Sequence, residues 1–187
     1  MPDSRNLARR DTPAGRILPV KIAFNIEELL GEMAVNLRTL LAAEEIAEPV
    51  LLGIRTGGVW VARRLHALLG LRTPLGELNI AFYRDDFSRV GVHPTVEPSN
   101  LPFEVDDRDL ILVDDILYTG RTVRAAMNEI FDYGRPHSIK LAVLFDRSGR
   151  ELPIQAEVVG AHLALKAREH AKLIGPENLA LEIHRGR

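Results

Sequence analysis

The 187-residue sequence contains no cysteine, which excludes disulfide bonds and thiolate metal sites. It also lacks any apolar run near the roughly 20 residues that a membrane-spanning helix needs. The segment 1–16 is polar and basic without an apolar centre, so it does not resemble a secretory signal. We therefore expect a cytoplasmic protein that makes no use of a membrane.

An excess of basic charge is missing as well. The chain has 24 Lys and Arg residues against 26 Asp and Glu residues, which gives a net charge of −2. Proteins that bind nucleic acids through broad electrostatic attraction usually carry a basic excess, so such binding is not expected. A local basic face stays open as an alternative, formed by Arg63, Arg64, Arg121, Arg124, Arg147, Arg150, Lys166 and Arg168.

Helical and strand patterns alternate along the chain. Apolar residues at helical spacing predict an amphipathic helix over 24–45, with Asn25 as its N-cap and Glu28 three residues later. Further helices are predicted at 59–70 and 121–133. Strands are predicted at 49–54, 75–86 (antiparallel or at an edge), 109–113, 138–146, 156–165 and 179–184. This order predicts an α/β fold with a mostly parallel sheet that helices cover on both faces.

The stretch LILVDDILYTGRT (110–122) is the most informative motif. An apolar strand is followed by two carboxylates, Asp114 and Asp115, and then by a loop of hydroxyl and glycine residues that opens a helix. Helix N-termini bind anions through free N–H groups, and carboxylates suit sugar hydroxyls or Mg²⁺. The motif therefore predicts a site for a phosphorylated sugar at the carboxyl end of the sheet. The structural alternative is that the two aspartates only cap the turn.

The segment VDDILYTGRT closely resembles the 5-phosphoribosyl-1-pyrophosphate (PRPP) binding motif of type I phosphoribosyltransferases. The resemblance implies their fold, a mostly parallel twisted sheet flanked by helices, with a flexible lid and a small hood. It also implies that Asp114 and Asp115 hold the ribose hydroxyls. The 5-phosphate would then be held by the loop residues Tyr118, Thr119, Gly120, Arg121 and Thr122.

A second stretch, LLGIRTGGVWVARRL (51–65), resembles the pyrophosphate loop and following helix of the pyrimidine operon regulator (PyrR) family. Several segments between 82 and 154 are similar to that family too. The resemblance implies that the backbone N–H groups of Thr56, Gly57 and Gly58 meet the pyrophosphate, with Arg55 nearby. The alternative is a tight turn that needs glycine. The family commonly has Thr-Arg-Gly where this chain has Thr56-Gly57-Gly58.

The resemblance implies a uracil phosphoribosyltransferase, a regulator of a pyrimidine operon, or both. Mg²⁺ is expected as cofactor, held by Asp114 and Asp115 indirectly through PRPP, and these two aspartates are expected to act with Arg84 as the catalytic residues. Asp85 or Asp86 would reach a metal-bound water, although 83–86 also fits a solvated strand end. The alternatives are an RNA-binding regulator that senses UMP or PRPP with little catalysis, or a phosphoribosyltransferase for another base.

The base is expected at Val159, Gly160 and Ala161, although the family usually continues there with Asn-Ile-Pro-Thr. RNA-binding members have a basic first helix, whereas the corresponding stretch here is apolar or acidic, with Arg38 as its one basic residue. Leader RNA is therefore a doubtful partner, and a homodimer or larger homo-oligomer is expected. The expected organisation is a mobile leader (1–20) and one domain (21–187), with a lid at about 84–104 and a hood from about 146 onward.

Overall fold

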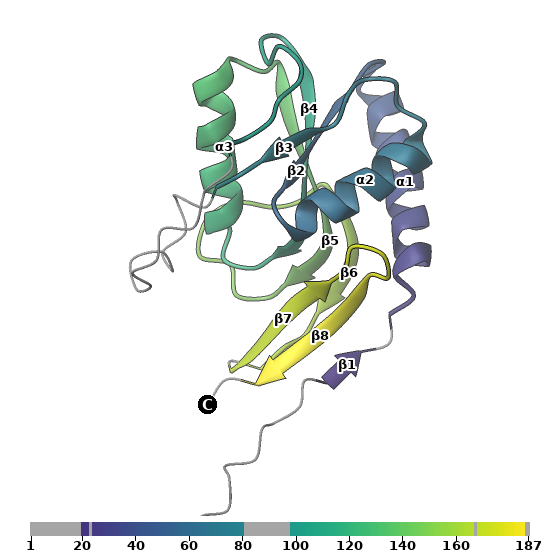
Figure 1. Ribbon diagram of the computed structural model, residues 1–187, viewed down its shortest axis with the longest axis vertical. Helices are drawn as coiled ribbons and strands as arrows, with labels where there is room; N and C mark the ends of the chain where they lie inside the picture. Colours follow the sequence, from purple (N-terminus) through teal and green to yellow (C-terminus); the bar gives the residue numbers. More distant parts are fainter. Residues whose placement is uncertain (1–19, 23, 81–97, 167, 186–187) are drawn as a thin grey trace, which may run out of the picture.

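A computed structural model describes residues 20–22, 24–80, 98–166 and 168–185. The elements follow one another in the order shown in Figure 1: β1 (Val20–Ile22), α1 (Ile26–Ala43), β2 (Val50–Ile54), α2 (Gly57–Leu69), β3 (Gly76–Leu78), β4 (Asp109–Leu117), α3 (Arg121–Tyr133), β5 (Ser138–Arg147), β6 (Val158–Leu163), β7 (Glu169–Ile174) and β8 (Ala180–Arg185).

The larger sheet has the strand order β3-β2-β4-β5-β6, and all of its neighbouring strands are parallel. Helices α1 and α2 lie on one face and α3 on the other (Figure 1). Successive side chains of a strand point to opposite faces, so Ile111 packs in the core cluster of α1 and α2 while Leu110 and Leu112 pack in that of α3. The predicted α/β fold with a covered parallel sheet is confirmed.

A smaller antiparallel sheet has the order β1-β8-β7. It lies next to β5 and β6 in the lower part of Figure 1. Its residues Leu173, Leu181 and Ile183 are buried and belong to the same core cluster as α1 and α2. The smaller sheet is therefore joined to the larger one by a shared apolar core.

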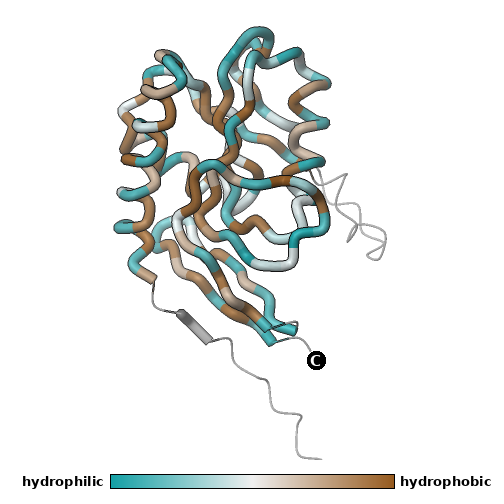
Figure 2. Tube along the Cα trace, turned by 180° about the vertical axis from the view of Figure 1, so that it is seen from behind, coloured by the Kyte–Doolittle hydropathy of each residue, from teal (hydrophilic) through white to brown (hydrophobic). Residues whose placement is uncertain are grey.

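The helices begin and end close to the predicted limits. The Asn25 side chain caps α1, because its Oδ1 accepts the backbone N–H of Glu28 at 3.3 Å. Helix α3 spans the predicted 121–133. Along α1, at the left edge of Figure 2, hydrophobic and hydrophilic stretches alternate as the helical spacing of its apolar residues predicts.

Two strand predictions need correction. Strand β4 runs on to Leu117 rather than ending at 113, because it pairs with β5 as far as Leu117↔Asp146. The described part of the predicted strand 75–86 is the short β3, which lies at the sheet edge as predicted and runs parallel to β2. Residues 81–86 lie outside the described residues, as do residues 1–19 of the predicted leader. Strands β1 and β7 were not predicted.

None of the helices in the described part of the chain is long and apolar enough to cross a membrane.

Gly53 gives a test of the packing between β2 and α2. A Cβ at this position would lie 2.6 Å from the Val59 Cα, closer than such atoms approach. Gly53→Ala is therefore expected to lower the free energy of unfolding by about 1–3 kcal/mol through overpacking. The matched control is Gly31→Ala in α1, where a Cβ would meet no atom within 4 Å. This control should raise stability by up to about 1 kcal/mol through helix propensity. Urea unfolding measures both, and similar small effects in the two variants would contradict the packing.

Candidate functional site

The pairing of β2 with β4 brings two loops to one edge of the sheet. The strands are parallel and aligned from Val50↔Leu110 to Gly53↔Val113. The 55–57 loop follows β2 and opens α2, while the 118–121 loop follows β4 and opens α3. Neither helix is capped by the side chain of its N-cap residue. The N–H of Arg121 donates to Oγ1 of Thr119 at 3.3 Å. The other N–H groups of the two first helical turns are not used by an N-cap side chain, so they can meet an anion at this edge.

The two loops border a pocket of about 430 Å³, within the range of roughly 300–1,000 Å³ that is usual for small-molecule sites. Its walls come from the 55–57 loop, α2, β4, the 118–121 loop, the end of β5, and β7. The lining residues are Arg55, Thr56, Gly57, Trp60, Asp114, Asp115, Ile116, Leu117, Tyr118, Thr119, Gly120, Thr122, Arg147, His170, Ala171, Lys172 and Leu173.

The acidic pair lies inside β4 and between the two loops. Asp114 is 4% exposed, and its Oδ1 accepts the backbone N–H of Asp115 at 3.0 Å. The Oδ1 of Asp115 accepts the N–H of Ile116 at the same distance. A Cβ at Gly57 would collide with the Asp115 carboxylate, so the 55–57 loop can pack this closely only because residue 57 has no side chain.

The 118–121 loop is held in place by the connector that follows β5. The carbonyl oxygen of Thr119 accepts the N–H groups of Glu151 and Leu152, at 3.0 and 3.1 Å. Arg150 donates a hydrogen bond to the carbonyl of Tyr118. Because these bonds engage carbonyl oxygens, the connector fixes the loop backbone without occupying the N–H groups of the loop.

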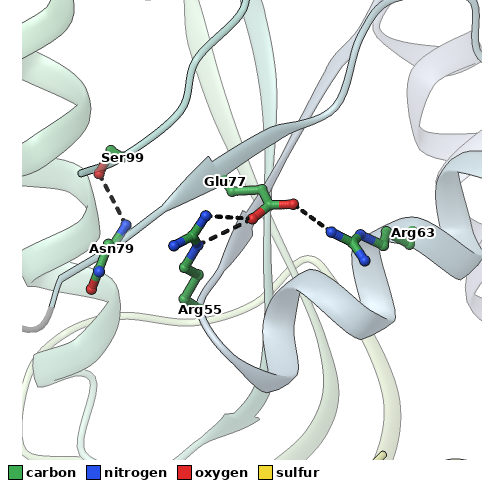
Figure 3. Close-up of polar contacts among 5 residues, drawn as sticks. All are labelled: Arg55, Arg63, Glu77, Asn79 and Ser99. Carbon is green, nitrogen blue, oxygen red and sulfur yellow. Dashed lines mark hydrogen bonds and ion pairs between the residues drawn. The ribbon is translucent and has the colours of Figure 1, made fainter. Parts of the chain in front are cut away.

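Arg55 stands at the rim of the pocket and is bound to Glu77 on β3. Its Nε and Nη2 lie 3.1 and 3.0 Å from Oε2 of Glu77, and Arg63 Nη2 lies 2.7 Å from Oε1 (Figure 3). Burial acts to raise the pKa of Glu77, but hydrogen bonds from Arg63 and Arg55 outweigh it and lower the pKa below its ordinary value. Glu77 is therefore a carboxylate at neutral pH.

Strand β7 and Arg147 form a further part of the pocket wall, which we call the far wall. Four consecutive residues of β7, from His170 to Leu173, line the pocket. A strand face would contribute every second residue, so β7 borders the pocket with its backbone edge. This edge is not paired with another strand of the described sheet. Arg147 is 5% exposed, and its guanidinium carbon lies 3.9 Å from the centre of the Tyr118 ring.

The pocket brings together most of the site residues predicted from the sequence. Both aspartates line it, with Arg55, Thr56 and Gly57 from the first loop. From the second loop it is lined by Tyr118, Thr119, Gly120 and Thr122.

Other predicted site residues lie elsewhere. Gly58 does not line the pocket and packs against the backbone of β4, and the Arg121 guanidinium is bound to Glu151 at 2.9 Å. Val159, Gly160 and Ala161 lie in β6, where Val159 pairs with Val143 of β5, and they are not part of the pocket wall. Arg84, Asp85 and Asp86 lie outside the described residues.

Sequence reasoning missed the contributions of Trp60, Arg147 and β7 to this pocket. Arg147 had been considered only as part of a possible basic face. In the sequence EHAKLI of β7, the polar residues His170 and Lys172 alternate with the apolar residues Ala171 and Leu173, which is a weak signal for a strand. Its charged residues obscured that signal.

No group of three or more His, Cys, Asp and Glu side chains able to hold a metal occurs among the described residues. The two pocket aspartates nevertheless have the oxygen ligands that Mg²⁺ prefers. They fit a Mg²⁺ ion whose remaining ligands come from a bound phosphate compound and water.

Comparisons with known proteins agree with this geometry. Residues 22–167 match the model of the phosphoribosyl transferase domain. The chain is 57% identical over 168 residues to the bifunctional protein PyrR of Nitrosococcus oceani, covering 89% of this chain and 95% of that protein. It is 58% identical to the bifunctional protein PyrR of Pseudomonas entomophila, covering 84% and 92%. The fold resembles that of the hypoxanthine phosphoribosyltransferase of Trypanosoma cruzi, with a TM-score of 0.63, 19% identity and coverage of 87% and 93%.

Proposed function

This chain belongs to the phosphoribosyl transferase family as a relative of the bifunctional PyrR proteins, and we propose that it is a uracil phosphoribosyltransferase. It would convert uracil and PRPP to UMP and pyrophosphate. The observation that carries the proposal is the pocket itself, in which two anion-binding loops flank a pair of carboxylates and face an unpaired strand edge.

PRPP has two anionic ends, which match the two loops. We assign its 5-phosphate to the 118–121 loop, with the hydroxyls of Thr119 and Thr122 as added donors, and its pyrophosphate to the 55–57 loop. The ribose hydroxyls would then meet Asp114 and Asp115 between the loops. The Arg121 side chain and Gly58, which do not line the pocket, are left out of these direct contacts.

We assign the base to the far wall rather than to Val159, Gly160 and Ala161. Uracil offers an N–H donor between two carbonyl acceptors, and an unpaired strand edge offers N–H and C=O groups in alternation. The edge of β7 can therefore recognise uracil through its backbone. Ile116, Leu117 and Trp60 supply apolar surface for the flat ring.

The reaction needs positioning and charge stabilisation rather than a protein nucleophile. A bond forms between N1 of uracil and C1 of PRPP, the bond from C1 to the pyrophosphate oxygen breaks, and the N1 proton is released. Negative charge develops on the leaving pyrophosphate, so the helix N-terminus of α2 and Arg55 stabilise the transition state. When bound, Mg²⁺ would add a positive charge against the pyrophosphate and ribose oxygens, next to Asp114 and Asp115.

The family relationship also supports proposals about organisation. We propose that residues 21–187 form one domain, in which the smaller sheet contributes to the hood and residues 84–104 form the lid. Arg84 is proposed as a catalytic residue in that lid. Self-association into a homodimer or larger homo-oligomer is proposed on the same basis.

A second candidate function is the regulation of a pyrimidine operon through leader RNA, because the relatives that cover most of the chain are named bifunctional. It is less favoured because the first turn of α1 is acidic, with Glu27 and Glu28. A gel shift with pyrimidine-operon leader RNA tests it at physiological salt. Nanomolar, UMP-dependent binding would establish the regulatory role, and no shift at micromolar protein would exclude it.

The choice of base is tested by offering uracil, hypoxanthine, guanine, adenine and orotate in turn with PRPP and Mg²⁺. We expect turnover with uracil at least about 100-fold above the others, since a wrong base leaves the polar groups of the β7 edge unpaired. Spectrophotometry follows nucleotide formation. If a purine is turned over instead, the proposed substrate is a purine rather than uracil. If no base is turned over, the proposed enzyme activity is refuted.

The double variant Asp114→Asn, Asp115→Asn tests the assigned ribose and Mg²⁺ contacts. Asparagine keeps the shape but removes both negative charges, so PRPP binding measured by calorimetry with Mg²⁺ is expected to weaken by at least about 100-fold. Circular dichroism and thermal unfolding serve as folding controls. An unchanged affinity for PRPP in a folded variant would show that the carboxylates do not contact the substrate.

A further inference from the structure

Glu77 is placed between two guanidinium groups that come from different elements. Figure 3 shows Arg55, from the loop after β2, on one side of its carboxylate and Arg63, from α2, on the other. Each oxygen of the Glu77 carboxylate binds one arginine. Oε2 accepts from Nε and Nη2 of Arg55, and Oε1 accepts from Nη2 of Arg63 at 2.7 Å. The side chain of Glu77 is 17% exposed and that of Arg55 is 26% exposed. Because both side chains are partly buried, water screens the contact between Arg55 and Glu77 less than it screens a surface ion pair.

The backbone that carries Glu77 is fixed from two sides. Its N–H and C=O both bond to Asn100 at 2.8 Å, and β3 pairs with β2 through Gly53↔Glu77. The backbone N–H of Arg55 also bonds to the carbonyl of Leu78, at 2.9 Å. The glutamate is therefore a rigid support, and the arginine that it holds is restricted at both its backbone and its side chain.

A short chain of contacts extends this support to α3. The N–H of Asn79 donates to Oγ of Ser99 at 2.9 Å, as Figure 3 shows, and Ser99 Oγ donates to Glu129 of α3 at 2.8 Å. The end of β3 is thus tied to the helix that the 118–121 loop opens. Small displacements of Glu77 relative to the pocket are accordingly resisted.

The charges of the three side chains do not cancel. One carboxylate meets two guanidinium groups, so the triad of Arg55, Glu77 and Arg63 keeps a net positive charge. Arg55 lines the pocket, whereas Glu77 and Arg63 do not. Arg63 offsets the negative charge of Glu77, so Glu77 can orient Arg55 without making the region around it acidic.

We propose that Glu77 is a positioning residue that orients the Arg55 guanidinium for the pyrophosphate group of PRPP, and that Arg63 balances its charge. This role rests on the proposed function, because it requires the 55–57 loop to receive pyrophosphate. It does not involve the 5-phosphate, which is assigned to the opposite loop. Loss of Glu77 should therefore affect the two anionic ends of the substrate differently.

The experiment measures the binding of inorganic pyrophosphate with Mg²⁺, and of UMP, by calorimetry on the full-length protein. In Glu77→Gln, the affinity for pyrophosphate is expected to fall on the order of tenfold, because the arginine loses its fixed orientation. The affinity for UMP should stay within about twofold, since UMP has no pyrophosphate. In steady-state assays the KM for PRPP should rise while the KM for uracil stays constant.

Whether pyrophosphate binding weakens or tightens in Glu77→Gln distinguishes an orienting role of Glu77 from a purely electrostatic one. Removing the carboxylate makes the triad more positive, so a purely electrostatic role predicts tighter pyrophosphate binding in Glu77→Gln. Tighter or unchanged binding would overturn the proposal, and so would an equal loss for pyrophosphate and UMP, which indicates general structural damage. If the wild-type protein binds neither ligand, the proposed function itself fails, whatever the variant does.

Three further variants complete the test. Glu77→Asp keeps the charge but withdraws the carboxylate by one methylene, and is expected to weaken pyrophosphate binding about threefold to tenfold; full affinity would overturn the positioning role. Arg63→Gln should weaken it about twofold to fivefold, because Glu77 then offsets the charge of Arg55. The matched control is Arg64→Gln, which removes the same charge from α2 but pairs with Glu27 away from the triad. It should bind both ligands as the wild type does.

Discussion

The parallel pairing of β2 with β4 is the constraint on which the rest of the site depends. It places Ile54 and Leu117, more than sixty residues apart in the sequence, near one edge of the sheet. A shift of the register by one residue would turn every side chain of β2 to the opposite face and separate Gly53 from α2. Because the strand residues pack into two different helix layers, the apolar core fixes this register and with it the spacing of the two loops.

The elements that carry local signals were predictable from the sequence. The helical spacing after Asn25 and the helix that begins at 121 each depend on neighbouring residues, and both agree with the structure. Strand β7 carries only a weak local signal, and its pairing with β8 and its place in the pocket are tertiary contacts. For the same reason, the sequence could not show that Val159 to Ala161, where the base was expected, lie in β6 outside this pocket wall, whereas we assign the base to β7. The Arg121 side chain likewise binds Glu151, which lies in a connector thirty residues away in the sequence, so its absence from the pocket could not be predicted locally.

The departure of this chain from its family at residue 57 has a physical explanation in the structure. The family commonly has an arginine there, so this chain lacks that positive charge at the pyrophosphate loop. In this chain the Asp115 carboxylate lies where a Cβ would be, so the space is used by the acidic pair. Positive charge beside the loop comes instead from the triad of Arg55, Glu77 and Arg63, whose members approach from three different elements.

The smaller sheet has a consequence for the order in which the protein folds. Strands β1 and β8 pair through Val20↔Ile183, which are about 160 residues apart in the sequence. Contacts of such long range close the largest loops and form late, after the local pairings of a parallel sheet with its helices. Strand β7, by contrast, pairs with β8 as a hairpin within residues 169–185, so this pairing can form before β1 joins the sheet. The strand edge that faces the pocket therefore belongs to a local hairpin, and its formation does not wait for the longest-range contact of the described chain.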